Sequence, residues 1–193
     1  MRTKRILLCL VCSVVGFGVC GCDKVVDAGA NVQLKQELSN ASVMVYPTFV
    51  RKFSGSIYDS NSARDIAATL KDIGFESVRV SNYEIPITGE TYMIQWKLFN
   101  QSKDLFVSYL KANPVDTDYV VLAEYLITPL RSGGQAAGGI HCFVLDKKGR
   151  VGLEILLNSH HKIFAEAKAK TTEDCTKVLI RTLKEQLEKR VKQ

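Results

Sequence analysis

The side chains able to act as nucleophiles or metal ligands are six cysteines and three histidines, which supply two of the ligand types that zinc prefers. Cys22 follows an apolar run, whereas His141 and Cys142 stand next to each other in an apolar segment. Adjacent residues of a strand point to opposite faces of a sheet. At most one residue of that pair, and one of His160 and His161, therefore reaches a common ion. We expect surface or hydrogen-bonded histidines, with no metal and no cofactor.

Signatures of catalysis are absent from residue 22 onward, where the sequence has no G-x-S-x-G, P-loop, H-E-x-x-H or C-x-x-C motif. The one C-x-x-C spacing, Cys9 to Cys12, lies in the amino-terminal apolar run. The glycine-rich stretch 133–139 has neither the Lys-Ser/Thr of a P-loop nor the G-x-G-x-x-G spacing, so we predict a mobile connection between strands. The sequence thus favours a non-enzymatic protein.

Glu124 is an isolated acid within the apolar segment 119–127. A buried carboxylate needs a partner or a raised pKa, and unpaired acids are rarely buried. We therefore expect Glu124 at an edge or a strand end with access to solvent. A position facing a cleft would instead make it a functional candidate.

The elements that position these residues follow from hydrophobic periodicity and from turn and cap signals. Gly74 marks a helix end, Ser62 resembles an N-cap, and 54–61 is polar and predicts a loop. We predict strands at 43–46, 77–81, 119–127, 140–145 and 151–157, an edge strand at 83–87 as an alternative, and helices at 62–73, 102–112 and 172–189. The expected fold class is α/β (α+β), a mixed sheet of about five strands with three packed helices in the order β-α-β-α-β-β-β-α. The segment 119–127 is the candidate for the sheet's centre.

The amino terminus has the composition of an export signal. Three basic residues precede the apolar run 6–19. The sequence Val19-Cys20-Gly21-Cys22 then resembles the lipobox of bacterial lipoproteins, with a branched apolar residue and two small residues before the cysteine. The resemblance implies removal of residues 1–21 and acylation of Cys22. A membrane-spanning helix over 6–21 falls short of the roughly 20 residues that a span needs.

Removal of the signal changes the charge balance. The chain has 26 basic and 20 acidic residues, a net charge of +6. Three of the basic residues lie in the signal, so 23 minus 20 leaves +3, which gives no support for nucleic-acid binding. We expect residues 22–40 to form a tether and residues 41–193 to form one domain. Fully extended, residues 23–39 of the tether reach about 55–60 Å at 3.3–3.6 Å per residue.

Two cysteines remain in that domain, Cys142 and Cys175. An exported protein is permitted a disulfide, but the bridge needs Cα atoms within about 7 Å of each other. The alternative is two small buried apolar side chains. The sequence leaves both interpretations open.

The domain also resembles a known envelope fold. The segment 43–49, an apolar strand ending near Pro47 and Phe49, precedes a helix that ends at Ile73-Gly74-Phe75. This order, continued through 119–127, 140–146 and the last helix, is similar to the amino-terminal domain of TolB and to the CsgG and LpoB lipoproteins. The resemblance spans about residues 42–190 and implies a membrane-held interaction module.

The favoured function is therefore a lipid-anchored protein of the bacterial cell envelope that binds another envelope protein. Asp23 after the acylated cysteine implies, by the rule of enteric bacteria, the inner membrane, with the outer membrane as the alternative; both place the domain in the periplasm. A periplasmic module for a small ligand or glycan, using 54–61 and the glycine-rich stretch, is the second hypothesis, and an enzyme is the third.

Overall fold

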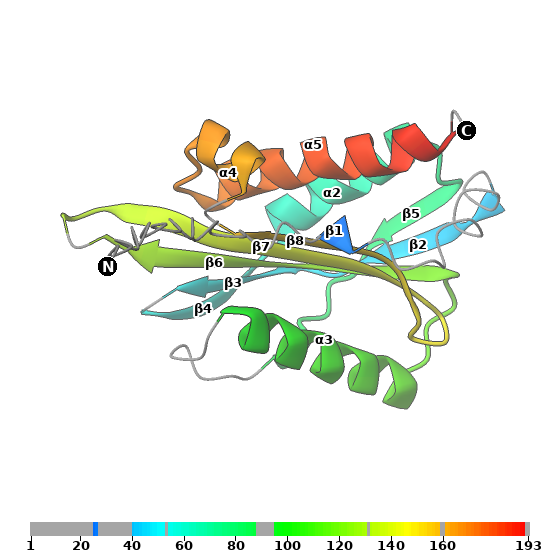
Figure 1. The fold of residues 1–193 in the computed structure, drawn as a ribbon. Coiled ribbons are helices and arrows are strands. Elements are labelled where there is room, and N and C mark those ends of the chain that lie inside the picture. Colours follow the sequence, from blue (N-terminus) through cyan, green and yellow to red (C-terminus); the bar gives the residue numbers. More distant parts are fainter. Residues whose placement is uncertain are drawn as a thin grey trace, which may run out of the picture.

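Strand β6 (Tyr119–Pro129) lies at the centre of an eight-stranded mixed sheet with helices on both faces (Figure 1). The computed structural model describes residues 25–26, 40–52, 54–87, 95–130, 132–158 and 161–191. The elements are β1 (Val25–Val26), β2 (Ser42–Val45), β3 (Thr48–Lys52), β4 (Gly55–Asp59), α2 (Ser60–Ile73), β5 (Ser77–Val80), α3 (Gln95–Ala112), β6, β7 (Gln135–Asp146), β8 (Val151–Asn158), α4 (Lys162–Ala167) and α5 (Thr172–Val191). The predicted fold class is confirmed.

The strand order is β1-β8-β7-β6-β2-β5. Strand β2 pairs in parallel with both β5 and β6, and β6, β7 and β8 follow one another antiparallel. The predicted central strand is therefore confirmed, as are the strands predicted at 140–145 and 151–157, which pair with each other. Burial of β6 on both faces explains why its sequence is almost continuously apolar.

Pro47 divides one long strand into β2 and β3. Proline has no N–H to donate to a ladder, and the backbone N–H of Tyr46 makes the last bond before it, to the carbonyl of Val121 at 2.9 Å. Strand β3 then resumes parallel pairing with β6 beyond the proline, and β4 pairs antiparallel with β3. Along one side, β6 thus pairs first with β2 and then with β3.

The prediction of a polar loop at 54–61 is wrong. Gly55–Asp59 forms β4, and α2 begins at Ser60. Among the described strands β4 pairs only with β3, and most of its residues are exposed. An exposed edge strand needs no apolar alternation, so its sequence resembles that of a loop. The predicted edge strand at 83–87 is also wrong, although Ile85 and Ile87 of this irregular segment are buried.

The ends of α2 and α5 have capping residues of the expected types, but the N-cap of α2 is not the residue predicted. Asp59, not Ser62, caps α2, since its carboxylate accepts from the backbone N–H groups of Asn61 and Ser62. Gly74 ends the helix at φ 118°, in the left-handed region that favours glycine. Thr171 caps α5 through its hydroxyl, which accepts from the N–H of Asp174 at 3.1 Å.

Two helices differ from the prediction in extent. Helix α3 begins at Gln95, a full two turns before the predicted start, so Trp96 lies within it. Helix α4 is an additional short helix, and β7 begins at Gln135, inside the stretch predicted as a glycine-rich loop. In β7 those small residues are paired with the end of β6. The sequence does not indicate this strand, because small residues give no alternation of apolar and polar side chains.

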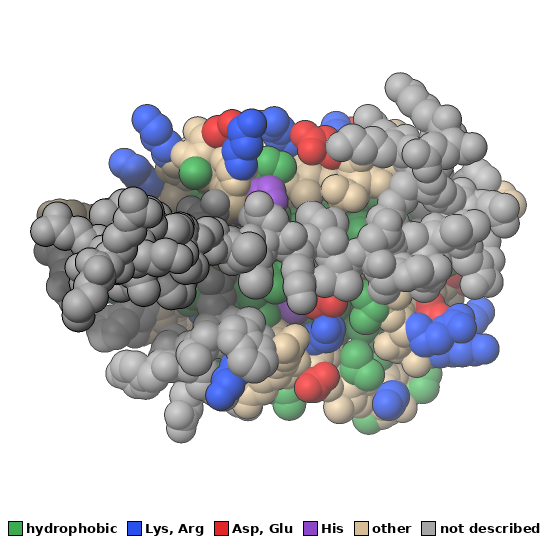
Figure 2. All heavy atoms as spheres, in the orientation of Figure 1, with side chains coloured by type: hydrophobic (Ala, Val, Ile, Leu, Met, Phe, Trp, Pro, Cys, Tyr) green, Lys and Arg blue, Asp and Glu red, His purple; other side chains and the backbone are tan. Residues whose placement is uncertain are grey.

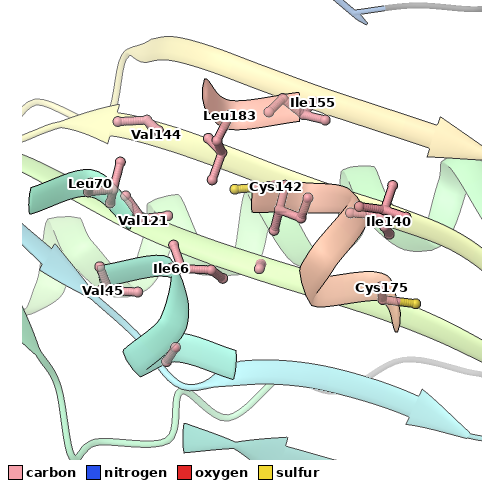
Figure 3. Packing of buried hydrophobic residues seen from close by; sticks show 14 of the residues in the cluster. Val45, Ile66, Leu70, Val121, Ile140, Cys142, Val144, Ile155, Cys175 and Leu183 are labelled. Atoms are coloured by element: carbon pink, nitrogen blue, oxygen red, sulfur yellow. The ribbon is translucent and has the colours of Figure 1, made fainter. Parts of the chain in front are cut away.

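The sheet separates two apolar layers. One face packs against α2 and α5 through Val45, Val121, Ile140 and Leu183, whose side chains converge in Figure 3. The opposite face packs against α3 in a smaller, more aromatic cluster, which includes Tyr46, Phe49, Phe106 and Phe143. Within the described ranges, no helix is long and apolar enough to cross a membrane.

Cys142 of β7 and Cys175 of α5 are buried in the first of these layers and are not bonded to each other. Their sulfur atoms lie well apart in Figure 3. Burial raises the pKa of each thiol to about 12. The structure therefore contains two small buried side chains here and no disulfide, which is the second of the two alternatives that the sequence leaves open.

Candidate functional site: a buried charge row beneath helix α3

Polar side chains of four neighbouring strands lie on the face of the sheet that α3 covers. Because side chains alternate along a strand, the residues opposite one another in the ladder share this face: Glu124 is paired with His141, and Phe143 with Glu154. We call the following set the charge row: Arg51 of β3, Glu124 of β6, His141 of β7, Glu154 of β8, and Ser102 and Lys103 of α3. The row crosses an otherwise apolar layer.

Arg51 and Glu124 form the inner half of the row. Their side chains are 1% and 0% exposed, and Nε of Arg51 donates to Oε1 of Glu124. Nη2 of Arg51 donates to Oγ of Ser102 at 2.9 Å, and the guanidinium lies 4.8 Å from the ring centroid of Phe49. The expectation that Glu124 has access to solvent is therefore wrong. Its partner comes from β3, a strand that the sequence analysis did not predict.

His141, Glu154 and Lys103 form the outer half. Nε2 of His141 lies 2.8 Å from Oε1 of Glu154, and Nζ of Lys103 donates to the same carboxylate at 2.9 and 3.1 Å. The His141 ring is buried between Phe99 and Phe143. The exposed fraction of the side chain rises from 1% at His141 to 13% at Glu154 and 22% at Lys103, so the row becomes more accessible to solvent towards β8.

The two acids of the row have opposite pKa shifts. Burial raises the pKa of Glu124 above its ordinary value, and the neighbouring guanidinium of Arg51 acts against this. Glu154 is closer to solvent, and its hydrogen bond to His141, together with that to Lys103, lowers its pKa to about 2. Glu154 is therefore ionised at neutral pH and balances the charge of Lys103.

Two buried atoms of the row have no hydrogen-bond partner among the described residues, Oε2 of Glu124 and Nδ1 of His141. A buried polar group without a partner costs about 1–3 kcal/mol. The row is thus expensive to bury, and its stability depends on the partners that it does have.

The hydrogen bonds of the row connect the sheet to α3. Oγ of Ser102 accepts from Arg51 and donates to the carbonyl of Leu98 at 3.1 Å. The polar partner of His141 within the described residues is Glu154. The row therefore joins four strands and α3 through polar and charged contacts.

The amino-terminal segment meets the row at its outer end. Strand β1 pairs antiparallel with β8, with Val25 opposite Ile155 and Val26 opposite Glu154. Part of the predicted tether is therefore hydrogen-bonded to the sheet. Cys22 itself lies outside the described residues, three positions before Val25.

The remaining candidates do not join the row. His161 caps α4 by accepting from the N–H of Ile163 at 3.3 Å, and His160 lies outside the described residues. His141 and Cys142 face opposite sides of the sheet, as their adjacency predicts. The described residues contain no group of three or more potential ligands that would hold a metal ion.

Sequence reasoning missed four members of the row: Arg51, Ser102, Lys103 and Glu154. A usable signal existed for Glu154, because the hairpin turn sets the register of β7 and β8 and brings an isolated acid diagonally across from His141. Arg51 had no such signal, since Pro47 suggests that the strand has ended.

Removal of one member of the Arg51–Glu124 pair should destabilise the fold more than removal of both. We expect Arg51→Met or Glu124→Leu alone to lower the free energy of unfolding by about 3–5 kcal/mol, because each leaves a buried charge unpaired. The double variant should be more stable than either single variant in equilibrium urea unfolding. The control is the exposed Glu173–Lys177 pair, whose alanine variants should unfold like the parent. Additive losses at positions 51 and 124 would contradict the pairing.

Acid should selectively remove the contribution of Glu154. Its folded pKa is lowered to about 2, so its stabilising effect is complete above the ordinary carboxyl pKa and is lost as the pH falls through about 2. Urea unfolding at pH 6, 4 and 2.5 should therefore give a difference between the parent and Glu154→Gln that shrinks as the pH falls. A difference that is constant with pH would show that the carboxylate is not held ionised by the row.

Comparison with known proteins gives limited similarity. No protein-family model and no curated protein matches the chain. A solved structure of a PelC dodecamer from Paraburkholderia phytofirmans is 14% identical and has a TM-score of 0.34, with 74% of this chain and 86% of that chain covered. A dodecamer of a PelC variant with one substitution, also 14% identical, has a TM-score of 0.35, covering 72% of this chain and 87% of that one.

Proposed function

We propose that this protein is a bacterial envelope lipoprotein, attached to a membrane by lipid on Cys22, whose domain is a non-enzymatic module that binds another envelope protein. The observation that carries the proposal is the sequence Val19-Cys20-Gly21-Cys22 directly after a basic start and an apolar run. A single acyl chain binds a bilayer only marginally, and stable anchoring takes at least two. The acylated cysteine of lipoproteins exceeds this requirement.

The edge strand β4 supports the interaction part of the proposal. On the described part of the chain β4 pairs on one side only, and Ile57 near its middle is 46% exposed. An edge strand with a free row of N–H and C=O groups accepts a further strand from a partner. The edge lies on the opposite side of the sheet from β1, so it is separate from the anchored segment.

Asp23 is the feature that bears on which membrane receives the anchor. In a host that follows the sorting rule of enteric bacteria, an aspartate after the acylated cysteine retains the lipoprotein in the inner membrane. We propose that location, with the domain in the periplasm.

Lipid attachment predicts labelling that depends on one thiol. Cells fed radiolabelled palmitate should label the native protein, and a Cys22→Ala variant should carry no label, because no other described thiol is accessible. The matched control is Cys20→Ala, which should label like the native protein. An unlabelled native protein, or a Cys22→Ala variant that labels equally, would contradict the proposal.

A partner at β4 predicts site-specific crosslinking. A photo-crosslinking amino acid at Ile57 should yield a discrete adduct in intact cells, and one at the exposed Lys111 of α3 should not. Ser56→Lys, which places a charge on the exposed edge strand, should weaken the adduct while leaving the protein folded by circular dichroism. Equal crosslinking at both positions would exclude β4 as the binding edge.

A further inference from the structure

We infer that the end of the domain formed by α4 and by the turn between β6 and β7 rests on the surface of an anionic bilayer. We call this end the anchor end and define it by Leu130, Ser132, Lys162, Lys168 and Lys170. The inference rests on the proposed lipid attachment and deepens it, because it states which surface the lipid holds against the membrane.

Chain length limits how far the domain can move from the lipid. Cys22 precedes Val25 by three residues, and a residue spans at most about 3.6 Å. The Cα atom of an acylated Cys22 is therefore within about 11 Å of β1, which is paired with β8. The expected reach of 55–60 Å for the tether does not apply while this pairing persists. The domain is consequently held close to the headgroups.

The direction of β1 determines which end of the sheet the lipid holds close to the membrane. Since β1 and β8 are antiparallel and Val25 lies opposite Ile155, the chain enters β1 from the side of the carboxyl end of β8, at Asn158. Helix α4 follows that end directly along the chain. The same end holds the turn between β6 and β7, because the N–H of Ala137 donates to the carbonyl of Ala169 just after α4, at 3.1 Å.

The side chains at this end suit a bilayer surface. Lys162, Lys168 and Lys170 are exposed, whereas Glu166 is the single acid among the described residues 161–172. Figure 2 shows Lys and Arg side chains over α4 and the adjoining part of α5, with Asp and Glu side chains among them. Exposed lysines within a Debye length of anionic lipid are attracted to it. Leu130, 43% exposed at the turn, adds an apolar side chain that can enter the interface.

Fluorescence quenching on vesicles tests the inference. The full-length protein with its lipid is reconstituted in vesicles of phosphatidylglycerol and phosphatidylcholine that contain a quencher attached to lipid. A fluorophore is attached at Ser132→Cys in the anchor end or at Ser77→Cys, which begins β5 at the other end of the sheet. The two buried native thiols do not compete for the label. We expect at least about fivefold stronger quenching at position 132, because quenching acts over short range and the lipid is tied within about 11 Å of β1. Equal quenching, or stronger quenching at position 77, overturns the inference.

Charge substitutions separate electrostatic docking from tethering alone. Replacing Lys162, Lys168 and Lys170 by Gln should lower the docked-to-undocked ratio on anionic vesicles by about tenfold or more. The matched control replaces Lys71, Lys111 and Lys148, which are exposed at the opposite end, and should leave the ratio unchanged. Equal effects of the two sets overturn the inference. The mass of the purified protein first establishes that lipid is present, so a failure to dock is distinguished from a failure of the proposed lipid attachment.

Discussion

The pairing of Glu124 with Arg51 is the constraint on which the α3 side of the structure depends. Both groups are removed from water, and they form an ion pair with each other. Desolvation of each ion is costly, and only close contact offsets it. The contact exists only if β3 resumes pairing with β6 after Pro47 and if α3 presents Ser102 to the guanidinium. Strand register and helix position are thereby set together by one ion pair in an apolar layer.

The same layer links the interior to the amino-terminal segment. His141 lies opposite Glu124 and contacts Glu154, and Glu154 is the register partner of Val26. The charge row thus begins among aromatic rings and ends where β1 joins the sheet. In the proposed lipoprotein, the contacts of the charge row therefore lie beside the segment that bears the lipid. The anchored edge at β8 and the open edge at β4 then lie on opposite sides of the sheet, which leaves β4 accessible to a partner.

The parts of the fold that could be predicted are those whose sequence signal is local. Gly74 marked the end of α2 because its positive φ requires glycine, and the apolar run of β6 marked the centre because both of its faces are buried. Strand β4 and helix α4 were missed because exposed, short elements lack a hydrophobic period. Glu124 was misplaced for a different reason. Whether a carboxylate is buried depends on a cation from elsewhere in the chain, and Arg51 is 73 positions away, beyond any local pattern.

If the protein is the envelope lipoprotein proposed above, the two buried sulfhydryl groups of Cys142 and Cys175 have a consequence for its folding. With their pKa values raised to about 12, both are protonated in the folded state and inert towards oxidants and alkylating agents. They become reactive only when the layer between the sheet and α5 opens. In the proposed lipoprotein, the interval before folding is therefore the period in which these thiols can form mispaired cross-links. After folding, the rate at which iodoacetamide modifies these positions measures how often the interior is exposed, without any engineered reporter.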